Sequence, residues 1–184
     1  MQHIKTPLML MLALTLAFSQ SHAQKKNKNQ DTEPRKAPEM PMENGQIVYA
    51  GVQKTSGKQA VLYKKAKDWF NGFYKNVTQV IKEDDEDKGS ITGQSRFKIN
   101  NYDEKTGTKS DAGLVQYTIV VTCKDGEYSY RIDKINWKKQ SYYGIETWLD
   151  TEGQYYTVRF IDYLEQTDEY LKNLEESLKS AMGQ

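Results

Sequence analysis

The chain has 184 residues and a nearly balanced charge, with 26 Lys and Arg, 25 Asp and Glu, and a single cysteine. This length suits one domain with a tail, and the charge offers no electrostatic footprint for nucleic acid or an anionic membrane. Both histidines precede residue 24, where we expect the mature chain to begin, which excludes His-dependent catalysis and His-based zinc sites from it. One cysteine excludes an internal disulfide and cysteine-cluster sites, so we expect no metal and no cofactor.

Residues 1–23 have the pattern of a secretory signal peptide. Lys5 precedes an apolar run over residues 8–18, and Ser21 and Ala23 have the spacing of a cleavage site. The run is too short to span a bilayer and no later segment is long enough, so we expect no transmembrane segment. No cysteine lies near the cleavage site, which disfavours a lipid anchor. We therefore expect an exported protein of the periplasm or the extracellular space.

Residues 24–42 are predicted to be a disordered linker. They contain three of the four prolines and almost no apolar residue before Met40. Such a segment cannot bury enough surface to offset the entropy of ordering it. Residues 43–184 then form a single domain.

The domain begins with a predicted strand at 46–53 and a predicted helix at 57–74. The apolar residues of the helix lie on one stripe, as expected for a helix that packs on a core: Leu62, Ala66, Trp69, Phe70 and Phe73. A short β-branched strand at 77–82 and an acidic turn at 83–89 are predicted to follow.

Residues 90–100 alternate strictly, which predicts a strand with one buried and one wet face. The side chains that share the inner face are Ile91, Gly93, Ser95, Phe97 and Ile99. Those of the wet face are Thr92, Gln94, Arg96 and Lys98. The polar residues 101–113 are predicted to form a loop.

The segment "YTIVVTCKDGEYSYRI", residues 117–132, predicts a β-hairpin. Asp125-Gly126 is a strong signal for a two-residue type I′ turn, which places Cys123 opposite Tyr128. In this register apolar residues meet on one face and mostly polar residues on the other. Cys123 has three possible roles: a nucleophile, half of an intermolecular disulfide, or a core side chain. The register favours a buried structural thiol of raised pKa and low reactivity.

The second hairpin strand is predicted to run to Ile135–Trp137, where a shift in side-chain parity indicates a bulge. Residues 137–163 hold eight aromatic residues, and Tyr155–Ile161 is predicted to be a short strand. A final helix is predicted at 168–182, with Thr167 as its N-cap and Gly183 after its end. Its apolar stripe consists of Leu171, Leu174, Leu178 and Met182, and Leu164 would extend it.

Four stretches carry a resemblance to a family of exported bacterial proteins: "ENGQIVYAGV", "LYKKAKDWFNGFY", "GSITGQS" and "VQYTIVVTCKDGEYSYRIDKINW". The chain resembles the domain-of-unknown-function family described as having a TBP-like fold, a fold like that of the TATA-box-binding protein. The resemblance covers about residues 43–137. It implies a fold and an export pattern but no catalytic residues.

Together these observations predict an α+β domain with two helices on one face of a curved antiparallel sheet, in the TBP-like order β-α-β-β-β-β-α. The wet sheet face offers hydrogen-bonding side chains to a ligand or partner, or it is merely hydrated. The wet-face residues considered are Gln94, Arg96, Lys98, Gln116, Thr118, Thr122, Ser129 and Arg131.

The aromatic segment is a second candidate surface. Its rings either stack on sugars or anchor a protein partner, or they cover the sheet edge and extend the core. The rings considered are Tyr142, Tyr143, Trp148, Tyr155 and Tyr156. The acidic residues 83–87 do not match an EF-hand, and we interpret them as a solvated turn, with cation binding left open.

We therefore expect a non-enzymatic binding or interaction module of the cell envelope, with an envelope protein or a small ligand as partner and no nucleic acid. The alternative is a carboxylate-dependent hydrolase acting on glycans, for which no pair of acids is singled out and no catalytic residue is assigned. The sequence does not indicate the oligomeric state. The predicted binding residues are Arg96, Lys98, Gln116, Thr118, Arg131, Tyr142, Tyr143 and Trp148.

Overall fold

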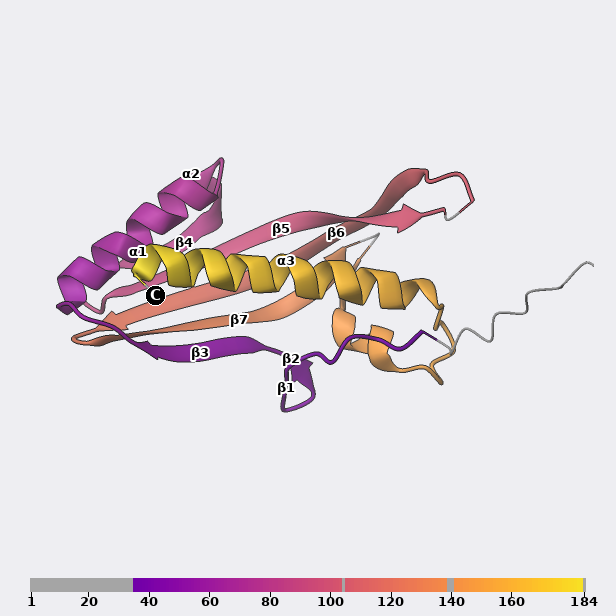
Figure 1. Ribbon diagram of the computed structural model, residues 1–184, viewed down its shortest axis with the longest axis horizontal. Coiled ribbons are helices and arrows are strands. Elements are labelled where there is room, and N and C mark those ends of the chain that lie inside the picture. Colours follow the sequence, from indigo (N-terminus) through magenta and orange to yellow (C-terminus); the bar gives the residue numbers. More distant parts are fainter. Residues whose placement is uncertain (1–34, 104, 139–140, 184) are drawn as a thin grey trace, which may run out of the picture. The chain divides into compact units, whose positions relative to one another are not determined.

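The computed structural model describes residues 35–103, 105–138 and 141–183 (Figure 1). The predicted signal peptide and the first part of the predicted linker lie outside the described residues. Among the described residues, no helix has the length and hydrophobicity needed to cross a membrane.

The described part of the predicted linker, 35–42, lies on the domain, and its last residue, Met42, begins a short strand. Arg35 forms ion pairs with Asp162 at 2.6 Å and with Glu165 at 2.7 Å. Met40 is buried and belongs to the hydrophobic core. These contacts join distant parts of the sequence, so composition alone did not indicate them.

Six strands form one antiparallel sheet in the order β3-β7-β6-β5-β4, with β8 paired to β7. The strands are β3 (Tyr49–Lys54), β4 (Ile81–Asp85), β5 (Ser90–Tyr102), β6 (Lys109–Lys124), β7 (Glu127–Lys138) and β8 (Tyr142–Gly144). A separate small hairpin consists of β1 (Met42–Glu43) and β2 (Gln46–Ile47). The helices are α1 (Gln59–Phe73), α2 (Val77–Val80), α3 (Arg159–Met182) and the 3-10 helix η1 (Ile145–Leu149). The long elements follow the predicted order and confirm the α+β class.

Helices α1 and α3 cover one face of the sheet (Figure 1). The predicted stripe of α3 is confirmed, because Leu171, Leu174, Leu178 and Met182 are fully buried. The stripe of α1 is buried as well, with Phe73 at its end only partly so. The two helices also join each other, since the Trp69 indole N–H donates to the Ser177 hydroxyl at 3.0 Å.

The predicted hairpin register is confirmed over its whole length. Lys124 lies opposite Glu127, and Cys123 lies opposite Tyr128. Cys123 is fully buried, and burial raises the pKa of its thiol to about 11, which fits a structural thiol. The predicted bulge is present too, because the β6–β7 register shifts next to Lys134, whose φ is +51°.

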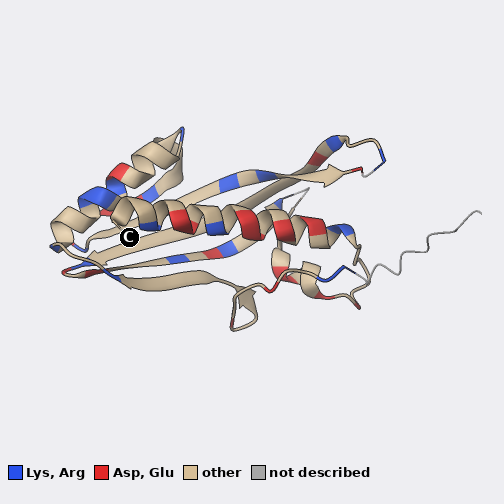
Figure 2. Ribbon diagram, viewed as in Figure 1, with Lys and Arg blue, Asp and Glu red and all other residues tan. Residues whose placement is uncertain are grey.

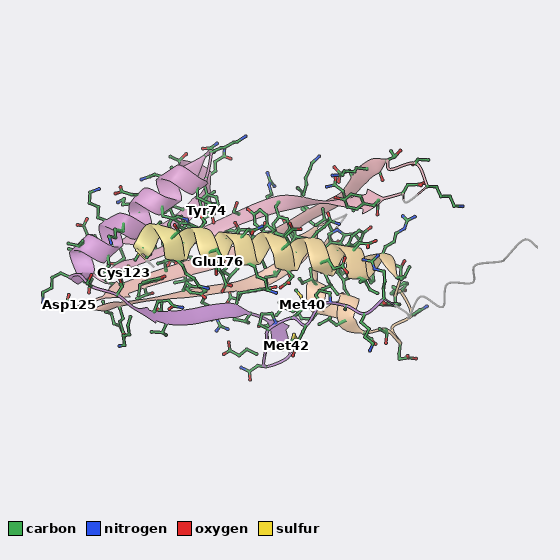
Figure 3. The ribbon with its side chains drawn as sticks, in the orientation of Figure 1. Met40, Met42, Tyr74, Cys123, Asp125 and Glu176 are labelled. Atoms are coloured by element: carbon green, nitrogen blue, oxygen red, sulfur yellow. The ribbon has the colours of Figure 1, made fainter. Side chains whose placement is uncertain are left out.

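The turn at Asp125-Gly126 also holds the start of α1, at the end of the domain where Cys123 lies (Figure 3). Helix α1 has no side-chain cap from Lys58, the residue that precedes it. Instead, the Asp125 carboxylate accepts the Gln59 backbone N–H and the Lys58 ammonium, each at 2.8 Å. The Gly126 N–H, in a residue with φ of +76°, donates to the Gly57 carbonyl at 2.9 Å. A carboxylate at a helix N-terminus is favoured by the helix dipole, so this turn both sets the strand register and docks α1.

Both glycines of "GSITG" have a structural role. Gly89 has a φ of +64°, and a Cβ there would lie 2.6 Å from the Cys123 carbonyl oxygen. A Cβ at Gly93 would lie 2.7 Å from a ring carbon of Phe70. Helix α1 therefore packs so closely on β5 that no side chain fits at Gly93.

Two predicted boundaries between 77 and 113 are wrong. The predicted strand at 77–82 is the short helix α2 followed by the start of β4, and β4 continues through the first three of the seven residues of the expected acidic turn. The predicted loop at 101–113 is mostly strand, because β5 and β6 extend to Tyr102 and from Lys109. Long-range pairing between these polar strand ends overrides their local preference for a loop.

The start of α3 is also predicted wrongly. The helix begins at Arg159, so residues Tyr155–Ile161 do not form the expected strand. Thr167 is a buried residue in the interior of the helix rather than its N-cap. The Thr167 hydroxyl donates to the Tyr163 carbonyl one turn earlier, at 2.7 Å. Asp168 likewise serves a tertiary contact, since it accepts the Tyr49 hydroxyl at 2.8 Å.

The close approach at Gly93 predicts opposite effects of two alanine substitutions. Gly93→Ala should lower the free energy of unfolding by about 1–3 kcal/mol, because the methyl group has to displace Phe70. Gly72→Ala, in α1 with no atom near its Cβ position, should raise it by up to about 1 kcal/mol. Urea unfolding followed by circular dichroism measures both, and a Gly93→Ala variant as stable as the wild type would contradict the packing.

The Asp125 contact predicts a dependence of stability on pH. The Lys58 ammonium lowers the pKa of the Asp125 carboxyl, so this group adds stability above its unfolded pKa of about 3.9 and loses it as pH falls through the folded pKa. Asp125→Asn keeps a residue that suits the turn but removes the charge. We expect a lower Tm for the variant at pH 7, and a difference from the wild type that shrinks below about pH 4.

Thermal unfolding by circular dichroism at pH 7 and pH 3 measures this difference. Asp68→Asn is the control, because Asp68 pairs with Lys64 on the exposed side of α1 and should lower Tm less. A gap between the wild type and Asp125→Asn that is the same at both pH values would contradict the assigned role of the carboxylate.

Candidate functional site

The face of the sheet opposite α1 and α3, called the open face below, carries exposed or half-buried side chains. The strand register places Arg96 beside Gln116 and Gln94 beside Thr118. The predicted wet face is therefore confirmed as a continuous surface. Its central residues are Thr92, Gln94, Arg96, Lys98, Gln116, Thr118, Val120, Thr122, Ser129 and Arg131.

Two of the predicted binding cations on the open face are held in ion pairs. Arg131 donates to Glu43 of β1 at 2.6 Å and to Asp133 at 2.9 Å. Lys98 pairs with Asp111 at 3.0 Å, and this contact lowers the pKa of the Asp111 carboxyl. Figure 2 shows residues of both charge signs spread over helices and strands. The face as a whole is therefore not a basic surface.

Three of the predicted binding residues, Arg96, Gln116 and Tyr142, come together on the open face. Gln116 lies opposite Arg96 on the neighbouring strand. The Tyr142 hydroxyl, from β8, donates to Gln116 Oε1 at 3.2 Å. The ammonium of Lys138 lies over the Tyr142 ring, 5.2 Å from its centroid. Residues from β5, β6 and β8 thus form one polar cluster.

A groove of about 430 Å³ adjoins this cluster. Gln94, Arg96 and Gln116 line it from the sheet. The segment from the end of α1 to the start of β4 forms the other wall, with Lys75, Asn76, Gln79 and Lys82. Tyr74, which follows the end of α1 (Figure 3), also lines the groove. Its hydroxyl and that of Tyr117 are hydrogen-bonded, 3.1 Å apart.

The groove is positively charged. Lys75, Lys82 and Arg96 line it, and none of its described lining residues is acidic. The Lys82 ammonium is fixed by the Gln79 carbonyl, to which it donates at 2.7 Å. Neither Lys75 nor Arg96 has an ion-pair partner among the residues that the structure describes. This arrangement can hold a carboxylate or another anion without first breaking an existing pair.

Sequence reasoning missed the second wall of the groove. A strand at 77–82 would have placed its residues alternately on two faces, whereas α2 lays Gln79 and the flanking lysines along one wall. Asn76 was the available signal, because Asn is a common N-cap residue and here occupies the N-cap position of α2.

The aromatic segment divides into buried and exposed rings. Trp148, predicted to bind a partner, is only 2% exposed and stacks on Phe160 at 5.6 Å between ring centroids. It also meets the edge of Trp137 at 5.5 Å, so it extends the core and is no contact residue. Tyr142 and Tyr143 remain about half exposed, and Tyr143 pairs with Trp137 in the β7–β8 ladder.

Two of the five acidic residues at 83–87 are paired with lysines. Asp84 accepts the Lys67 ammonium at 2.8 Å and the Tyr63 hydroxyl, and these contacts lower its pKa. Asp85 accepts the Lys88 ammonium at 2.7 Å, with the same effect on its pKa. Within the described part of the chain, no three His, Cys, Asp or Glu side chains are placed to hold a metal ion.

Several carboxyl groups have shifted pKa values, and the shifts are downward. Lysine partners cause most of them, and backbone N–H groups cause that of Asp103. A general acid in glycan hydrolysis needs a raised pKa, so these groups offer no support for the hydrolase alternative. The groups are Asp84, Asp85, Asp103, Asp111, Asp125 and Glu127.

Comparison with known proteins gives a family and a fold. A family model described as a domain of unknown function (DUF4468) with TBP-like fold matches residues 44–138. A crystal structure of a DUF4468 family protein from Bacteroides ovatus is 22% identical, with a TM-score of 0.64 over 79% of this chain and 91% of that chain. A TBP-like protein from Parabacteroides distasonis is 18% identical, with a TM-score of 0.63 over 78% of this chain and 96% of that chain. No curated protein matches significantly.

Proposed function

This chain belongs to the DUF4468 family of domains with a TBP-like fold, and we propose that it is a non-enzymatic binding module whose contact surface is the open face. The partner is a protein of the cell envelope. Export is part of this proposal, because residues 1–23 have the composition of a signal peptide.

The observation that carries the proposal is the cluster of Arg96, Gln116 and Tyr142 beside the positively charged groove. These are exposed or half-buried groups on a sheet whose other face already supplies the core. Polar side chains on a rigid sheet lose little entropy when they engage a partner, which favours binding at such a surface.

Nucleic acid is not the partner that we propose, although the fold takes its name from a DNA-binding protein. Binding to phosphate backbones depends on many unpaired Lys and Arg side chains. On the open face Arg131 is paired with Glu43 and Asp133, and Lys98 is paired with Asp111. Lys75, Lys82 and Arg96 line the groove, a small group of cations that suits a protein segment better than a duplex.

Site-specific photo-crosslinking tests the proposal. A photoreactive amino acid at Thr118 or Ser129, both on the open face, is compared with the same residue at Lys64, an exposed position on α1. Each variant is expressed with its natural leader and irradiated in intact cells of the source bacterium. We expect Thr118 and Ser129 to give one shared adduct, which Lys64 does not give.

The adduct should also depend on the polar cluster. In the variant with the photoreactive residue at Thr118, the further substitution Arg96→Glu should reduce the yield of the adduct by about 10-fold. This is the effect expected from the loss of one charge-assisted contact. Adding Lys64→Glu should leave the yield unchanged. An adduct that forms only from Lys64, or equally from all three positions, would contradict the assignment of the open face.

A further inference from the structure

Strand β5 has an edge that the rest of the sheet does not use. Strand β4 pairs with β5 only between Ser90 and Gly93, whereas β5 continues to Tyr102. At the far end, the Gln166 side chain of α3 covers the edge: it accepts the Asn100 N–H at 3.0 Å and donates to the Asn100 carbonyl at 2.9 Å. A gap of several residues lies between these two partners.

The backbone groups in this gap can be assigned by alternation. In an antiparallel ladder, successive residues direct their N–H and C=O groups toward opposite neighbours. The Gly89 carbonyl accepts the Cys123 N–H from β6, so odd-numbered residues of β5 point toward β6. Asn100 bonds to Gln166 instead, so even-numbered residues point toward the edge. The register shift between Ile99 and Asn100 places its extra residue in β6, so the alternation along β5 continues and both ends of the strand give the same assignment.

Arg96 and Lys98 therefore present their backbone N–H and C=O groups at the free edge. No hydrogen bond from elsewhere in the described chain reaches these groups. A row of unpaired backbone groups on an edge strand is a template for an added strand. Natural sheets often protect such an edge with Lys or Arg side chains. Here Arg96 and Lys98 would repel a second strand that carries positive charge.

The groove lies along this edge. It is lined by Ser95 from the helix-covered side of β5 and by Gln94 and Arg96 from the open face, so it follows the strand edge between the two faces. Lys75 and Lys82 stand on its opposite wall, and none of its described lining residues is acidic. The edge supplies main-chain hydrogen bonds, and the groove supplies positive charge on both sides.

We propose that the edge of β5 at residues 94–98 accepts an extended, acidic segment of a partner protein as an additional strand. The main chain of the segment pairs with Arg96 and Lys98, and its carboxylates meet Lys75, Lys82 and Arg96. This proposal rests on the proposed function, because it names the partner chemistry at one border of the open face.

A strand fits this place better than a small anion does. The outward-facing groups of Arg96 and Lys98 are spaced two residues apart, about 6.6 Å along the strand. A carboxylate offers acceptors only, and a single inorganic phosphate, although it can donate through P–OH, is too small to bond to both carbonyls at this spacing. A peptide main chain offers donors and acceptors with the matching repeat, which is how β-augmentation gains its affinity.

Labelled peptides test the proposal with the full chain. The probe is a fluorescent peptide of sequence Thr-Glu-Val-Glu-Val-Glu-Thr. One control has Lys in place of Glu, and a second has Pro in place of Val, which keeps the charge but removes main-chain donors. Fluorescence anisotropy gives the affinities, and amide exchange by NMR reports on the Arg96 and Lys98 N–H groups.

We expect the acidic probe to bind at least about 10-fold more tightly than either control and to slow exchange at Arg96 and Lys98. Arg96→Gln should weaken binding by about 10-fold, whereas Lys64→Gln, which removes an exposed lysine outside the groove, should leave it unchanged. Equal binding of the proline peptide, absence of saturable binding, or slowed exchange with inorganic phosphate alone would each overturn the added strand.

The two proposals fail separately. If the peptide does not bind but Thr118 and Ser129 still give a shared crosslink, the β5 edge is wrong and the open face stands. If the peptide binds and no crosslink forms at the open face, the partner contacts only the edge, and the broader contact surface is overturned.

Discussion

The two-residue turn at Asp125-Gly126 is the constraint on which the rest of the domain depends. It fixes the β6–β7 register, which decides that Cys123 and the residues in phase with it face the helices. Its carboxylate also caps α1 at Gln59, so it places the helix that covers this face. A change of one position in this register would exchange the inner and outer side chains of the central strands. The open face exists because the turn prevents that exchange.

The groove follows from the close seating of α1 on the sheet. Because Gly93 leaves room for Phe70, α1 ends directly above β5, and the chain returns through α2 into β4. Strand β4 has five residues and β5 has thirteen, so β4 cannot cover the β5 edge. The same short connection carries Lys75 and Lys82 to the uncovered part. Packing in the core thus determines where positive charge and free backbone groups meet.

The sequence predicted what short-range periodicity controls. Apolar residues repeat with a period of two along the hairpin strands and the strand of the wet face, and with a period close to four along α1 and α3. These elements were predicted for that reason. Trp148 was misplaced because an aromatic side chain has the same local signature in a core and at an interface. The two acids that follow Thr167 predict a helix N-cap there, although helix α3 begins eight residues earlier. Lys75 and Lys82 were missed because the groove joins segments that only the tertiary fold brings together.

Amide hydrogen exchange along β5, measured by NMR on the free protein, tests the central claim most directly. The register makes Ser95 and Phe97 donors to β6 and leaves Arg96 and Lys98 facing the edge. We predict that the Arg96 and Lys98 amides exchange at least about 100-fold faster than those of Ser95 and Phe97. Equal protection of all four amides, or fast exchange at Ser95 and Phe97 instead, would contradict the register and the surfaces derived from it.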